Sequence, residues 1–254
     1  MINKNGFSLI ELLVALGIIA ALATIAIPSI KAMQKSYDST GAESMISAAL
    51  STARTIAISE QKYAGVRFQK IYVADSNKIP DADQYMIFII NDEDMGSLSD
   101  AFRAIEGYKP MKLPGNSGVM DLKIVNVDIT LDSQIAGDYD IADTSSFSIV
   151  FSPSGKVVIH NVQIRNRDGA TESDDSSEDE IFNTLNNVKK GNALFLQDYT
   201  TRSYGLGKEQ SRKKFKICDS DKFKKMDKDK RYTDYLKELK FICLNPYTGE
   251  IIKK

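Results

Sequence analysis

Few side chains in this sequence are of the types that carry out catalytic or metal chemistry. Its 254 residues include one histidine, His160, and two cysteines, Cys218 and Cys243. Zinc and iron sites need three or four clustered nitrogen or sulfur ligands, and serine or cysteine nucleophiles usually need a histidine beside them. We find no phosphate-binding loop with its full spacing either. The sequence therefore predicts a protein that is not an enzyme and that uses no cofactor and no metal.

One carboxylate stands where a charge is unfavourable. Glu11 lies at the edge of an uncharged, mostly apolar run at residues 12–30. The run is close to the ~20 residues that a helix rising ~1.5 Å per residue needs to cross a bilayer, so we expect a membrane span at about residues 9–30. An unpaired carboxylate near the centre of a bilayer costs about 2.5 kcal/mol or more. Glu11 therefore needs a cationic partner.

The partner that the sequence offers is an amino terminus. An ordinary secretory signal is cut after its apolar core, whereas here a polar stub precedes the run and ends at Gly6. Cleavage after Gly6 would leave a free amine on Phe7, about 6 Å from Glu11 along a helix. The same amine on a neighbouring copy would be better placed, and pairing with it would remove the penalty. Glu11 is thus predicted to be a self-assembly residue.

These residues form a recognisable motif. The stretch GFSLIELLV at residues 6–14, followed by Pro28 near the end of the run, resembles the class III signal of type IV pilins and type II secretion pseudopilins. The resemblance implies that a membrane peptidase cuts after Gly6, removing residues 1–6 as a leader, and methylates Phe7. It also implies that Glu11 is the glutamate at the fifth mature position, which sets the register between subunits.

The resemblance further implies where the protein lies and what it meets. The expected partners are other pilin or pseudopilin subunits, the prepilin peptidase, an assembly platform in the inner membrane, and the lipid bilayer. The expected location is the bacterial inner membrane, crossed once with the C-terminal head outside the cytoplasm, and also the assembled pilus or pseudopilus. A plain signal-anchor helix in which Glu11 is incidental is the alternative.

Two residues inside the apolar run are expected to weaken the helix. Pro28 has no backbone donor and would bend or loosen the helix near the outer face of the membrane. In the family, such positions allow local melting during assembly. Gly17 either does the same or allows close packing of helices.

The pattern after the run predicts an α+β, pilin-like fold. Apolar residues recur at three- or four-residue steps to about residue 62, which predicts one long helix over residues 7–62. Stretches rich in β-branched and aromatic residues then predict an antiparallel sheet against this helix, in a head at residues 63–254; they lie at residues 63–73, 84–91, 122–131 and 147–164. Turns are expected at Ser152-Pro153-Ser154-Gly155 and at residues 245–249, with a final strand after the second.

A second resemblance is to H-type minor pseudopilins and FimT-type minor pilins. It rests on the alanine-arginine segment at residues 45–57, the strand at residues 64–68 and the turn at residues 152–156. Arg54 in this segment is expected to be a solvated helix residue rather than one with a specific contact.

The last ninety residues depart from a compact pilin. Residues 168–180 carry seven acids and no base, which predicts a solvated loop, with calcium binding as an alternative. Residues 208–240 carry thirteen bases against seven acids, which predicts a mixed-charge solvated helix. Cys218 and Cys243 each end a short apolar segment, and outside the cytoplasm we expect a disulfide between them; two free thiols are the alternative.

Together these observations predict a structural subunit, a minor pseudopilin of a type II secretion system. The alternative is a minor pilin of a type IV pilus that binds DNA during uptake through residues 208–240, although a net charge of −1 argues against nucleic acid as the main partner. A membrane-anchored enzyme is the third reading, and no motif supports it.

Overall fold

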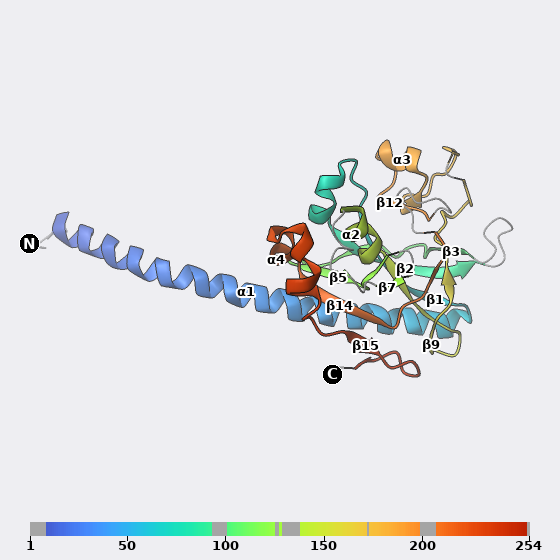
Figure 1. Ribbon diagram of the computed structural model, residues 1–254, viewed down its shortest axis with the longest axis horizontal. Helices are drawn as coiled ribbons and strands as arrows, with labels where there is room; N and C mark the ends of the chain where they lie inside the picture. Colours follow the sequence, from blue (N-terminus) through green and yellow to red (C-terminus); the bar gives the residue numbers. More distant parts are fainter. Residues whose placement is uncertain are drawn as a thin grey trace, which may run out of the picture.

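A computed structural model of the chain shows a long helix that is partly embedded in an α+β head (Figure 1). It describes residues 9–92, 101–124, 127–128, 138–171, 173–198 and 207–252, without the side chains of Glu11, residues 18–39, 124, 127–128 and 138. The helix α1 runs from Leu9–Glu60. Its N-terminal half projects away from the head, and its C-terminal half packs against the sheet.

One stripe of α1 binds it to the head. The buried residues of the stripe recur every three or four positions, which is the period of one helix face. They are Ala42, Ile46, Ala49, Leu50, Ala53, Ile56 and Ala57. Because many of them are alanines, the backbone of α1 can lie close to the sheet that covers it. The amphipathic pattern in the sequence predicted this contact.

The main sheet is antiparallel, as predicted. Its strand order is β3-β2-β1-β8-β9, and β4 also pairs with β2. Ala64 at the start of β1 pairs with Ile90 on one side and Phe151 on the other. The strands are β1 (Ala64–Lys70), β2 (Gln84–Asp92), β3 (Ala101–Ala104), β4 (Met111–Lys112), β8 (Phe147–Phe151) and β9 (Val157–Val158). The strand expected over residues 122–131 is instead the short pair β6 (Lys123–Ile124) and β7 (Val127–Asp128), in the described part of that range.

Both faces of this sheet are buried. Alternate residues of β1, β2 and β8, such as Phe68, Phe88 and Ile149, pack against α1. The residues between them, such as Ile87 and Val150, belong to a second apolar cluster on the opposite face. A strand buried on both faces has a continuous apolar run rather than an alternating one, and Met86-Ile87-Phe88-Ile89-Ile90 in β2 is such a run.

Segments from the C-terminal half of the chain cover this second face. Val162, Ile164, Phe182 and Phe195 pack into its apolar cluster. The segments contain two short pairs of strands and one helix, and we call them together the cover. The pairs are β10 (Asn161–Val162) with β13 (Glu209–Gln210) and β11 (Phe182–Asn183) with β12 (Phe195–Leu196), and α3 (Leu185–Lys189) lies between β11 and β12 in the chain.

A second antiparallel sheet has the order β16-β15-β14-β5 and is built mainly from the C-terminal residues. Its strands are β5 (Ser117–Met120), β14 (Lys214–Asp219), β15 (Ile242–Leu244) and β16 (Ile251–Ile252). A small apolar cluster beside it includes residues of η1 (Ser76–Asp81), α2 (Asp138–Ser145), α4 (Ser220–Lys225) and η4 (Tyr232–Leu236), and the short η3 (Lys228–Lys230) precedes η4. The solvated helix predicted for residues 208–240 is therefore wrong. Residues 214–219 instead form β14, and Phe215 on this strand is fully buried in the same apolar cluster as the stripe of α1.

The two predicted turns are present, and both lie beside Arg54. Gly155 and Gly249 have φ of 77° and 70°, a left-handed conformation that glycine adopts readily. Gly155 N donates to Ser152 O at 2.8 Å, and Gly249 N donates to Asn245 O at 2.8 Å. Arg54 Nε donates to Gly155 O at 2.8 Å. The expectation that Arg54 is merely solvated is thus wrong, because the hairpin turn folds back onto α1.

The predicted disulfide does not form in this structure, where both cysteines are free. Cys243 on β15 pairs with Lys214 of β14, whereas Cys218 pairs with Gly118 of β5. Cys218 is four residues from Lys214 along the same strand, which places the two cysteines about 13 Å apart in this register. A disulfide needs Cα atoms within about 7 Å, so the strand register excludes it.

The two thiols are expected to differ in reactivity. Cys218 is buried, and burial raises the pKa of its thiol to about 12, whereas Cys243 is half-buried. Because the thiolate is the reactive form, a thiol reagent should label native protein once, at Cys243, and denatured protein twice without reductant. Mass spectrometry of the full-length protein in detergent measures this. Native Cys243→Ser should stay unlabelled, and native Cys218→Ser should be labelled as wild type is. If denatured wild type is labelled only after reduction, the two cysteines form a disulfide and the arrangement described here is wrong.

Candidate assembly site

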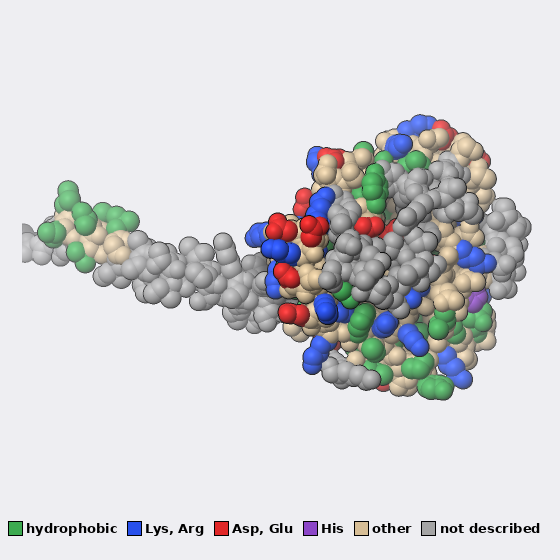
Figure 2. All heavy atoms as spheres, in the orientation of Figure 1, with side chains coloured by type: hydrophobic (Ala, Val, Ile, Leu, Met, Phe, Trp, Pro, Cys, Tyr) green, Lys and Arg blue, Asp and Glu red, His purple; other side chains and the backbone are tan. Residues whose placement is uncertain are grey.

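The first turns of α1 present an apolar surface with no cover. Six large apolar side chains there are between 55% and 83% exposed; they are Leu9, Ile10, Leu12, Leu13, Val14 and Leu16. They occupy neighbouring positions, so they surround the helix and do not form one stripe, and they lie at the far end of the projecting helix (Figure 2). A helix that is apolar all round is normally buried in a protein core or in a membrane. This end of α1 therefore needs a partner that covers it.

Some of the predicted site residues lie within the described part of the structure and some do not. Gly6 and Phe7 lie outside the described residues, and of Glu11 only the helical backbone is described. Pro28 lies within α1, which continues through it as one helix. Glu11 is the third residue of the helix, where a negative charge is favoured by the helix dipole.

The length of α1 separates Glu11 from the head. Among the residues of α1 described with their side chains, Ala42 is the first that is buried against the head. It follows Glu11 by 31 positions, and a helix that rises about 1.5 Å per residue puts roughly 45 Å between them. No side chain of the chain's own head can cover that distance. A partner for Glu11 must come from the chain's own N-terminus or from another molecule.

No helix long and apolar enough to cross a membrane was found among the residues described with their side chains. The expected span at residues 9–30 includes Glu11 and residues 18–30, whose side chains are not among them.

The acidic segment at residues 168–180 is folded against the head and is not wholly solvated. Asp179 is buried and accepts hydrogen bonds from Arg167 N and Ile181 N, both at 2.8 Å. Asp168, Glu178 and Glu180 are exposed. The bond from Ile181 N closes a tight turn, and the bond from Arg167 N ties Asp179 to a residue twelve positions earlier, so Asp179 holds the two ends of the acidic segment together.

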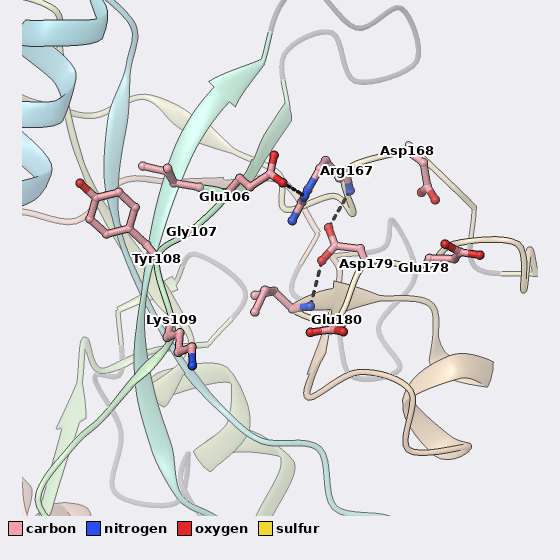
Figure 3. A pocket seen from close by; sticks show the side chains of 11 residues that line it. Glu106, Gly107, Tyr108, Lys109, Arg167, Asp168, Glu178, Asp179 and Glu180 are labelled. Carbon is pink, nitrogen blue, oxygen red and sulfur yellow. Dashed lines mark hydrogen bonds and ion pairs between the residues drawn. The ribbon is translucent and has the colours of Figure 1, made fainter.

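A hollow of about 730 Å³ lies between this acidic segment and the loop at residues 105–109 (Figure 3). Arg167 Nη1 pairs with Glu106 Oε1 at 3.2 Å across one side of it. Sequence reasoning missed this hollow, because the two loops that form it are far apart in the chain. Among the described residues, no three His, Cys, Asp or Glu side chains gather as ligands for a metal ion.

Comparison with known proteins locates the similarity at the N-terminus. Residues 1–27 match the family model described as the prokaryotic N-terminal methylation motif. No curated protein matches the chain, and no solved structure does. The matched residues include Gly6, Phe7 and Glu11, which are the residues predicted to take part in processing and assembly. They also include the exposed apolar turns at the start of α1.

The exposed end of α1 should contribute nothing to the stability of the head. Leu13 is 64% exposed and lies far along the helix from Ala42, whereas Ala53 of the same helix is fully buried against the sheet. Leu13→Asp should therefore change the free energy of unfolding of the head by less than about 0.5 kcal/mol. Ala53→Asp buries an unpaired carboxylate and should cost about 4 kcal/mol or more, or prevent folding.

Thermal unfolding of both full-length variants in detergent, followed by near-ultraviolet circular dichroism, measures the difference. Equal destabilisation by the two substitutions would mean that the N-terminal turns pack on the head, contrary to this arrangement.

Proposed function

We propose that this chain, whose first 27 residues carry the class III prepilin signal of type IV pilins and pseudopilins, is a minor pseudopilin of a type II secretion system. The observation that carries the proposal is this motif, which lies at the exposed apolar end of a helix embedded in a folded head. Proteins with this signal are filament subunits. The role of the chain is accordingly structural, and its chemistry is that of processing and assembly.

Processing and assembly use the residues of the motif in turn. The prepilin peptidase cuts after Gly6, and the new amino group on Phe7 is methylated. Until assembly, the inner membrane covers the apolar turns of α1, and the head lies outside the cytoplasm. In the filament, the helices of neighbouring subunits replace the lipid, and Glu11 pairs with the Phe7 amine of a neighbour. This pairing fits the distance of roughly 45 Å along α1 that separates Glu11 from Ala42, which is buried against the head.

The choice of a minor pseudopilin follows the second resemblance. The alanine-arginine segment of α1 and the turn at residues 152–156 both belong to it. In the structure these two segments meet, because Arg54 Nε donates to Gly155 O at 2.8 Å. The two segments on which the second resemblance rests thus lie together in the fold, and the expected partners are the other pseudopilins and the inner-membrane assembly platform.

A minor pilin that binds DNA is the second candidate, and residues 208–240 are its basis. Arg212, Lys216 and Arg231 in this segment are buried, which removes them from any phosphate surface. The exposed lysines around α4 alternate with aspartates, and blue and red side chains alternate at that edge of the head in Figure 2. The geometry therefore argues against a DNA-binding surface in this segment. DNA binding that weakens steeply with salt would favour the pilin.

The first experiment tests the signal itself. Wild-type protein from membranes that contain the cognate peptidase should begin at N-methylated Phe7, and Gly6→Ala should remain full length, because the peptidase needs glycine at the end of the leader. Intact mass and N-terminal sequencing give the answer. An unprocessed wild type would remove the proposal and leave a protein with an apolar helix of unknown role.

The second experiment tests assembly. Glu11→Gln should leave cleavage unchanged but reduce cross-linking between subunits at least about tenfold, as expected when an ion pair in an apolar environment is lost. Glu60→Gln, an exposed glutamate at the other end of α1, is the matched control and should assemble like wild type. Normal cross-linking of Glu11→Gln would contradict the role of Glu11. Loss of protein export in a deletion strain, with surface pili intact, would favour secretion over a pilus.

A further inference from the structure

The hollow between the loop at residues 105–109 and the acidic segment is large enough to hold part of another molecule (Figure 3). Its volume of about 730 Å³ lies within the range of roughly 300–1,000 Å³ that is usual for ligand sites. Ile105, Tyr108 and Ile181 give it apolar surface, and every other lining residue except Gly107 is charged. The charges therefore decide which ligand fits.

Two of the five carboxylates that line the hollow already have partners. Glu106 pairs with Arg167, whose Nη1 lies 3.2 Å from Glu106 Oε1. Asp179 is buried, and its oxygens accept hydrogen bonds from Arg167 N and Ile181 N. These interactions also occupy the guanidinium group of Arg167, which is one of only two basic side chains in the lining.

The other three carboxylates of the lining have no cationic partner. Asp168, Glu178 and Glu180 are exposed, and none of them forms an ion pair with a lysine or arginine in the described part of the chain. Lys109, the second basic residue of the lining, forms no ion pair there either. Five acids against two bases give the lining a net charge of −3. Like charges held close together repel each other, so a cation in the hollow would be favourable.

The acidic wall of the hollow is held in place from behind by buried amide side chains. Asn183 Nδ2 donates to Asp179 O at 2.8 Å, and Gln197 Nε2 donates to Ala170 O at 2.8 Å. Both amides belong to the cover, and both side chains are fully buried. The carboxylates are thus attached to a fixed backbone, and a ligand would not have to order this wall when it binds.

The opposite wall offers an aromatic ring. Tyr108 is 43% exposed, and its ring stands edge-on to Phe88 with 5.1 Å between the ring centroids. Ile105 N donates to Phe88 O at 3.0 Å, which ties the loop to β2. An ammonium or guanidinium group is attracted to the face of such a ring, and the carbon chain of lysine or arginine packs on apolar surface. Carboxylates on one wall and an aromatic ring on the other therefore fit a long basic side chain.

We propose that this hollow is the docking site for a segment of a protein partner that carries two or more lysine or arginine side chains. A bare metal ion fits less well, because no three His, Cys, Asp or Glu side chains converge among the described residues. Nucleic acid and other anions are repelled by the net charge. The proposal goes beyond assembly through α1, since it concerns what the head recognises.

A fluorescent peptide of four arginines that alternate with glycines is a suitable probe. At low salt, its anisotropy with full-length protein in an uncharged detergent should show saturable binding of one peptide per chain. Glu178→Gln combined with Glu180→Gln should weaken this binding about fivefold or more, as expected when two partly exposed ion pairs are lost. The same peptide with glutamine in place of arginine should not bind.

A second double variant controls for general attraction between opposite charges. Glu60→Gln combined with Glu238→Gln removes the same charge from exposed positions outside the hollow, and it should bind the peptide as wild type does. All four positions are exposed, so both double variants should keep the near-ultraviolet circular dichroism of wild type. Equal weakening by the two double variants, or no weakening by either, would overturn the proposal.

Photo-cross-linking locates the bound peptide. A benzophenone group on the same peptide should cross-link to residues 105–109 and 167–181, as mapped by mass spectrometry. Cross-links confined to other parts of the chain would overturn the proposal, and so would binding of spermidine without binding of the peptide. Cleavage after Gly6 and pairing of Glu11 play no part in this test. An unprocessed wild type would therefore remove the proposed function and leave the docking site standing.

Discussion

The packing of one stripe of α1 against the main sheet is the contact on which the rest of the molecule depends. Ile46, Leu50 and Ala53 are each no more than 1% exposed there, and they meet Phe68 and Phe147 across the interface. Because this contact fixes the C-terminal half of a single continuous helix, the N-terminal half cannot fold back onto the head. The apolar turns that begin at Leu9 are thereby held away from the head (Figure 1), where only lipid or other molecules can cover them.

The opposite face of the sheet sets the arrangement of the C-terminal residues. Apolar side chains such as Ile89 and Phe102 make most of that face, and Arg67 places a charge in its middle. A buried charge is tolerated only when it is paired, and removing one partner costs far more than the pair contributes. Arg67 pairs with Asp198 at 2.8 Å and with Glu209 at 3.0 Å, so the positions of these two carboxylates are strongly constrained. This is a physical reason for residues 195–212 to return to the sheet rather than form a separate unit.

Turns and strands could be predicted from the sequence where neighbouring residues determine them. The turns at Ser152 and Asn245 follow from proline and glycine, and the strands β1, β2 and β8 follow from β-branched and aromatic runs. Predictions were wrong for residues whose contacts lie far away in the sequence. Residues 208–240 are rich in charge, but Phe215 and Leu236 are buried against other parts of the head, so the segment is broken into a strand and short helices. Arg54 was read as solvated because Gly155, which accepts its hydrogen bond, is 101 residues away.

The sequence by itself determined the N-terminal methylation motif, the apolar end of α1, the α+β character of the head and the residues at which processing and assembly are expected. These follow from short-range features: a glutamate and a glycine at fixed spacing, an uncharged run, and periodicities of 3.6 and 2. Only the tertiary structure decided the register of β14 against β15, which separates Cys218 from Cys243. It alone also brought Arg67 together with Asp198 and Glu209. The physical reason is that strand register and buried ion pairs depend on which distant segments meet, and composition and spacing along one chain do not encode that directly.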